Sequence, residues 1–312
     1  MADILSPAKC KSEQTKFFSC DIFDTYKDDS ASMEHPVFSL STKPDYRMLV
    51  YKYNGNTIKI KPSYTGLATI HDKDILLYLT SCLMNAKNKG LYISNRIRFT
   101  AYEYLVATKK TTTGKSYIKL QESLERLSGT RIETDIKTRG RQITEEFGLI
   151  NSWHVVRERE DGQMIAVEVV LSEWFYNSVL GNSVLSIDRD YFKLRKPTER
   201  RLYELARKHC GNQVMWKISL DKLKDKIGSN SQLKKLRFNI RKLIESNHLP
   251  EYNISMENDV VTFTRKSPPK VNKAPKKLSQ HISEPDINKH ARPGESRAQV
   301  IARLKELQTA LR

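Results

Sequence analysis

Residues 219–247, SLDKLKDKIGSNSQLKKLRFNIRKLIESN, decide the fold of the C-terminal part of the chain. Ser219 is a favourable N-cap for a helix over 220–227, the Gly-Ser-Asn triplet at 228–230 forms a turn, and Ser231 caps a second helix. Two helices joined by so short a turn predict a helix–turn–helix unit. The second helix carries an apolar stripe at helical spacing, formed by Leu233, Leu236, Ile240, Leu243 and Ile244.

The face of the second helix opposite this stripe is cationic. Lysine and arginine bind phosphates and guanine edges, and asparagine pairs with adenine, so such a face suits the major groove of DNA. The alternative is a solvated basic face on a helix that serves only the core. Phe238 lies off the stripe, where it either packs against a neighbouring element or touches a thymine methyl group. The candidate DNA contacts are Lys234, Lys235, Asn239, Arg241 and Lys242.

The elements around this helix pair predict a winged helix, which is a helix–turn–helix followed by a β-hairpin. A helix over 197–209 and a strand over 215–218 precede the pair, and a hairpin over 252–264 follows it. The same order recurs upstream. There we expect helices over 72–86, 100–106 and 116–127 and then strands over 131–136, 147–156 and 163–171. The expected fold class is therefore α+β, with two tandem winged-helix domains over 45–185 and 186–265.

The first of these domains offers a weaker candidate surface for DNA. Its second helix, over 116–127, is less basic because two glutamates offset its cations. Such a helix depends on its wing for affinity, and the basic loop over 137–144 can supply phosphate contacts. Ordinary hairpin-loop charges would look the same. The candidate residues are Lys119, Ser123 and Arg126 on the helix and Lys137, Arg139 and Arg141 around the loop.

The charge of the whole chain favours a polyanionic partner. Its 312 residues carry 54 Lys and Arg against 36 Asp and Glu, a net charge of +18. The net charge is −3 over residues 1–45 and +7 over residues 266–312, so residues 46–265 carry a net charge of +14. The longest apolar stretch, 76–84, is too short to cross a membrane, and no signal peptide precedes it. The four cysteines lie far apart, which fits free thiols in a reducing cytoplasm.

Three segments outside the two domains have compositions of their own. Residues 1–44 are expected to be a flexible acidic lead-in, and residues 266–295 a disordered basic linker that is rich in proline and lysine. Residues 296–312 form an amphipathic tail helix. This pattern favours a helix that binds a partner protein or a second copy of itself, and it favours binding to an anionic membrane surface less strongly.

Motifs for catalysis are weak. Gly114-Lys115-Ser116 resembles the end of a phosphate-binding loop, but the leading glycine of that motif would fall on Lys109. The seven histidines show no metal-ligand spacing. We therefore expect no metal, no cofactor and no enzymatic activity, although a triad assembled in space would escape a sequence search.

Three groups of spaced blocks resemble the replication initiator protein A family of bacterial plasmids. The first joins Leu124–Ile136 to Phe147–Ile150, and the second joins Tyr191–Leu194 to Arg201–His209. The third consists of Trp216–Leu220, Leu236–Ile240 and Leu249–Tyr252. The resemblance covers about residues 45–265 and leaves the lead-in and the tail outside it.

The resemblance implies a cytoplasmic plasmid initiator with two winged-helix domains. Such proteins bind repeated origin sequences (iterons) in double-stranded DNA, help to open the origin, recruit host replication proteins including the replicative helicase, and often repress their own promoter as homodimers. The helices over 116–127 and 231–247 would each enter a major groove, unless the first domain lies along the backbone and serves the dimer interface. A winged-helix transcription regulator would have similar residues, and a nucleic-acid enzyme would need a metal-dependent activity that no motif predicts.

Overall fold

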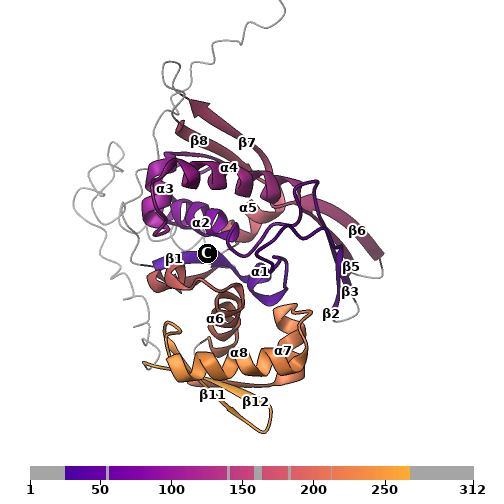
Figure 1. Cartoon of the computed structure of the whole chain (residues 1–312). Coiled ribbons are helices and arrows are strands. Elements are labelled where there is room, and N and C mark those ends of the chain that lie inside the picture. The colour runs from indigo at the N-terminus through magenta and orange to yellow at the C-terminus, as the bar shows by residue number, and fades with distance from the viewer. Residues whose placement is uncertain are drawn as a thin grey trace, which may run out of the picture. The chain divides into compact units, whose positions relative to one another are not determined.

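The computed structural model describes residues 25–53, 56–138, 141–157, 164–181, 184–211 and 213–267, and these fold as a mixed α+β protein (Figure 1). They belong to one compact unit that ends at Pro268. Residues 1–24 of the predicted lead-in, the predicted linker from position 268 onward and the predicted tail helix over 296–312 lie outside the described residues.

The C-terminal region consists of three helices and a three-stranded sheet, and it confirms the elements expected there. Local signals set several of its boundaries. Proline occupies the first turn of α6, and Gly228 ends α7 in the left-handed conformation, with a φ of 73°. Asn258 and Asp259, with φ of 47° and 58°, form the two-residue turn between β11 and β12. The elements are α6 (Pro197–Cys210), β10 (Met215–Ser219), α7 (Leu220–Ile227), α8 (Leu233–Ser246), β11 (Tyr252–Glu257) and β12 (Val260–Arg265).

The N-terminal region repeats this order of elements. Thr100 and Glu103 form a capping box at the start of α3, because each side chain accepts a hydrogen bond from the backbone of the other. The strands pair in the order β4-β8-β7, which matches β10-β12-β11 in the C-terminal region. The duplicated architecture therefore extends to the strand order. The elements are α2 (Lys73–Asn88), β4 (Arg96–Phe99), α3 (Ala101–Ala107), α4 (Gly114–Gly129), β7 (Ile150–Arg157) and β8 (Met164–Leu171).

A second sheet in the N-terminal region corrects the predicted position of the wing. The hairpin of β5 (Arg131–Thr138) and β6 (Arg141–Gly148) pairs through β5 with β3 (Asn56–Lys61), which pairs with β2 (Leu49–Tyr53). The basic loop over 137–144 therefore belongs to the sheet β2-β3-β5-β6. The hairpin that occupies the place of β11–β12 in the repeated order is instead β7–β8.

The prediction of a flexible lead-in over 1–44 is wrong from Thr25 onward. Strand β1 (Thr25–Asp29) pairs antiparallel with β9 (Val184–Asp188), and α1 (Ser30–Glu34) follows it. Met33, Val37 and Phe38 are buried. Strand β9 also crosses the predicted domain boundary at 185/186, and the chain continues as the 3₁₀ helix η1 (Arg189–Lys193). Helix α5 (Glu173–Leu180) lies between β8 and β9 in the chain.

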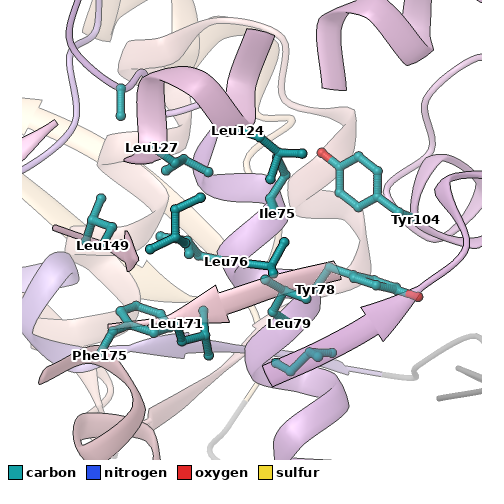
Figure 2. Close-up of a cluster of buried hydrophobic side chains, with 14 of the residues drawn as sticks. Ile75, Leu76, Tyr78, Leu79, Tyr104, Leu124, Leu127, Leu149, Leu171 and Phe175 are labelled. Carbon is teal, nitrogen blue, oxygen red and sulfur yellow. The ribbon is translucent and has the colours of Figure 1, made fainter. Parts of the chain in front are cut away.

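Two hydrophobic cores form, and α2 contributes to both. Figure 2 shows Ile75 and Leu76 of α2 beside Leu124 and Leu127 of α4, and all four belong to the core of the N-terminal region. Leu77 instead joins the core around α6, α7 and α8. Full burial of such a side chain contributes roughly 1.5–3 kcal/mol. Packing on both sides of α2 thus joins the two regions.

A buried ion network reinforces this junction. The Nζ of Lys73 lies 2.7 Å from an Asp28 oxygen and 3.1 Å from a Glu204 oxygen, and all three residues are almost fully buried. Burial alone would lower the pKa of Lys73, but the two carboxylates outweigh it and raise that pKa. Asp74 pairs with Arg200 of α6 and with Lys110 of the α3–α4 turn. Charges on β1, α2 and α6 therefore compensate one another inside the protein.

Candidate nucleic-acid interface

Helix α8 presents the most strongly cationic face of the C-terminal region. Leu236, Ile240 and Leu243 are buried in the core, as the apolar stripe predicts. Lys234, Lys235, Arg241 and Lys242 are exposed on the other side of the helix. The structure thus brings together four of the five residues predicted there. The fifth, Asn239, is half-buried at the edge of this face.

Phe238 lies within this cationic face. Its side chain is 55% exposed, and it belongs to neither hydrophobic core. The ammonium group of Lys242 lies 4.6 Å from the ring centroid, within the range of a cation–π contact. The surface of α8 therefore combines an aromatic ring with positive charge.

A salt bridge that the sequence did not reveal fixes α8 to the hairpin that follows it. The guanidinium of Arg237 donates to both carboxylate oxygens of Asp259 in the β11–β12 turn, at 2.8 and 2.7 Å. These hydrogen bonds lower the pKa of Asp259. No spacing rule links a helix residue to a turn 22 positions later, so only the fold shows this contact.

Helix α4 has fewer free cations than its sequence predicts. Lys119 is exposed, and the Ser123 hydroxyl donates to the Lys119 carbonyl oxygen at 2.8 Å. Arg126 donates to both carboxylate oxygens of Asp72, at 2.8 Å each, and Asp72 is buried just before α2. Arg126 thus ties α4 to α2, an arrangement that competes with contact to a base.

The predicted wing contacts of the first domain fall on the other sheet. Lys137 and Arg141 are placed in β5 and β6, but their side chains are outside the described residues, as is all of Arg139. The β7–β8 hairpin contacts α4, and Arg157 donates a hydrogen bond of 3.0 Å to Gln121. Residues 158–163 between those strands lie outside the described residues.

A cavity of about 610 Å³ adjoins the outer face of α4. Of its cations, Lys109 pairs with Asp190 at 2.8 Å and Lys110 with Asp74. Burial, together with the nearby charge of Arg200, lowers the pKa of His71 to about 4. Lys109 and Lys110 are therefore neutralised by internal carboxylates. The lining of the cavity also includes the exposed residues Lys43, Lys119 and Arg195.

The residues that the structure describes contain no cluster of His, Cys, Asp and Glu that could hold a metal ion. Within that same part of the chain, every helix is too short or too polar to cross a membrane.

A duplicated helix–helix–hairpin architecture with a cationic outer helix is typical of proteins that bind nucleic acid. The sequence model of replication initiator protein A matches residues 27–254, and the chain belongs to that family. Family membership assigns it a role in the initiation of replication.

One relative agrees with this assignment, and two solved structures are similar in fold. A Wigglesworthia glossinidia brevipalpis protein, provisionally named a replication protein, is 42% identical over 247 residues, which are 78% of this chain and 90% of that protein. A crystal structure of domains 2 and 3 of RctB is similar in fold, with a TM-score of 0.59 at 12% identity over 77% of this chain and 99% of that one. A second structure of RctB domains 2–3 gives a TM-score of 0.50 at 14% identity, over 75% and 96% of the two chains.

Proposed function

We propose that this protein is a plasmid replication initiator that binds repeated origin sequences in double-stranded DNA. The observation that carries the proposal is the outer face of α8, where four exposed cations surround an exposed aromatic ring. Cations of this kind bind phosphates and base edges in the major groove. In the same proposal, the bound protein promotes opening of the origin, recruits the host helicase and initiator proteins in the cytoplasm, and represses its own promoter.

Both regions act as winged-helix domains in this proposal. The matching strand orders β4-β8-β7 and β10-β12-β11 support it, because in each sheet one strand precedes a pair of helices joined by a short turn and a hairpin follows that pair. The wing of the first domain is then β7–β8, so its phosphate contacts are to be sought there and not around 137–144. The short, acidic β11–β12 turn, held by Arg237, leaves α8 as the main base-contacting element of the second domain.

The proposed activity is binding and not catalysis. The protein would use the energy of DNA binding to recruit other proteins, with no cofactor or metal of its own. A nicking assay on supercoiled DNA with Mg²⁺ tests this directly, because relaxed circles that depend on the protein would reveal a nuclease.

A salt-titrated binding isotherm tests the main proposal. The probe is duplex DNA from the origin of the replicon that encodes this chain, with a scrambled duplex of equal length as the control. We expect a preference of about 10³ or more and a steep salt dependence. Equal affinity for the two duplexes would contradict the proposal.

A plasmid-maintenance test then separates an initiator from a transcription regulator. Each variant gene is supplied to a plasmid that carries the origin but lacks its own copy. An initiator supports replication of this plasmid, and a regulator with the same DNA target does not.

A further inference from the structure

Phe238 occupies a position on α8 that the fold does not explain. It is two residues away from both Leu236 and Ile240, and at about 100° per residue such neighbours lie on nearly opposite sides of a helix. Because Leu236 and Ile240 are buried, Phe238 lies near the middle of the outward face, with 55% of its side chain exposed. A single exposed apolar side chain is common on protein surfaces, so it is the charge gathered around this ring that indicates a surface covered on binding.

The surroundings of the ring restrict what can cover it. On a helix surface, a residue is flanked by those three and four positions before and after it. For Phe238 all four of these neighbours are exposed cations, and Lys242 lies over the ring at 4.6 Å. A second copy of this chain docked face to face would bring like charges together. The four flanking residues are Lys234, Lys235, Arg241 and Lys242.

The partner must therefore combine dense negative charge with a small apolar group. Duplex DNA does so in its major groove, where phosphates line both edges and the only apolar group on a base edge is the thymine methyl. When a helix enters this groove, residues in the middle of its outward face reach the bases, and residues on either side of that face reach the phosphate backbone.

We propose that Phe238 is a specificity-determining residue that recognises thymine through its methyl group. The flanking cations hold the phosphates, and the ring covers the methyl group on the floor of the groove. This inference rests on the proposed DNA-binding function and adds to it the residue and the base that it selects.

The experiment compares thymine with uracil, which lacks only the 5-methyl group. Full-length protein first selects its preferred duplexes from a randomised 25-base-pair library. Each thymine in the selected duplex is then replaced singly by uracil, and affinities are measured by fluorescence anisotropy. The variants are F238A and F238L, with V214A as the matched control, because Val214 is an apolar residue of similar exposure, 60%, outside the proposed interface. Far-UV circular dichroism checks that each variant is folded.

For the wild type and V214A we expect one or two positions at which uracil lowers affinity about fourfold, which corresponds to burial of one methyl group. F238A should bind the thymine and uracil duplexes with equal affinity at those positions. At all other positions its response to uracil should match that of the wild type. F238L should keep part of the affinity difference between thymine and uracil. If the selection yields a motif but F238A keeps the wild-type uracil profile, or the wild type shows no uracil effect, the role of Phe238 is overturned. If no motif emerges at all, the proposed function itself fails.

Discussion

Arg126 shows how a side chain that looks like a DNA contact can serve the fold. Its two hydrogen bonds to the buried carboxylate of Asp72 join α4 to the start of α2. We expect Arg126→Ala to lower the free energy of unfolding by about 2 kcal/mol, because it leaves that carboxylate without its cation. Sequence preference for DNA should stay unchanged. Urea denaturation and a binding assay on two related duplexes measure the two effects, and relaxed specificity without lost stability would restore Arg126 as a base contact.

His71 provides a pH-dependent contribution to stability. Burial lowers the pKa of His71 to about 4 from an ordinary value of 6.5, so the folded protein favours the neutral ring. Between these two values the unfolded chain binds more protons, and the free energy of unfolding therefore falls as the pH drops through that window.

Between pH 6.5 and pH 4 the wild type loses stability because unfolding lets the His71 imidazole bind a proton. We expect the His71→Gln variant, which lacks this imidazole, to lose about 2 kcal/mol less over the same range. Urea denaturation at several pH values measures the change. His154→Gln removes an exposed imidazole from β7 and is the control. Equal pH dependence in the wild type and His71→Gln would show that the ring is already charged in the folded state.

At the scale of elements, the proposal gives α8 and α4 different roles. Arg241→Ala on α8 should weaken binding to the preferred duplex by about 1–3 kcal/mol and relax its specificity, as expected for a base contact. Lys119→Ala on α4 should weaken binding to all duplexes alike and reduce the magnitude of the salt slope by about one, as expected for a phosphate contact. Competition titrations at several salt concentrations distinguish the two patterns. A uniform loss from Arg241→Ala would contradict its assignment to a base.

The sequence predicts elements better than it predicts their partners. Periodicity and capping residues located α7 and α8 to within one or two residues, because those signals are local. The alternating pattern predicts β5, β7 and β8 but reads most of β6 as a loop, and it does not say which hairpin joins which sheet, so the basic segment at 137–144 was assigned to the wrong one. Helical spacing places Phe238 off the apolar stripe but does not predict its exposure, and the pairing of Arg126 with Asp72 depends on two helices meeting.

At the scale of the whole molecule, the acidic N-terminal segment shows why composition alone misled. Asp28 and Asp29 look like solvated residues of a flexible segment, yet both are buried. Asp29 accepts hydrogen bonds from Ser32 and Ser178, and Asp28 faces Lys73, which lies 45 positions later. A charge can be buried only where the fold supplies its partner, and no local window of sequence contains that partner.

The network around Lys73 gives the last prediction. Lys73→Met leaves Asp28 buried without a cation and should lower the free energy of unfolding by about 3–5 kcal/mol. The double variant K73M/D28L removes both charges, and Glu204 keeps Arg201 at 3.2 Å and the Tyr191 hydroxyl at 2.7 Å. It should therefore recover most of the loss, since replacing a whole buried pair with apolar side chains is close to neutral.

Urea denaturation of the full-length chain measures this cycle. Lys193→Met is the control for removing a lysine, because its pair with Asp190 is exposed, at 63% and 47%, and contributes at most about 1 kcal/mol. Because the network joins β1 and α2 to α6, we expect the described regions of the wild type to unfold in one cooperative transition. If Lys73→Met costs no more than Lys193→Met, the two regions are held together by the packing around Leu77 and not by their buried charges.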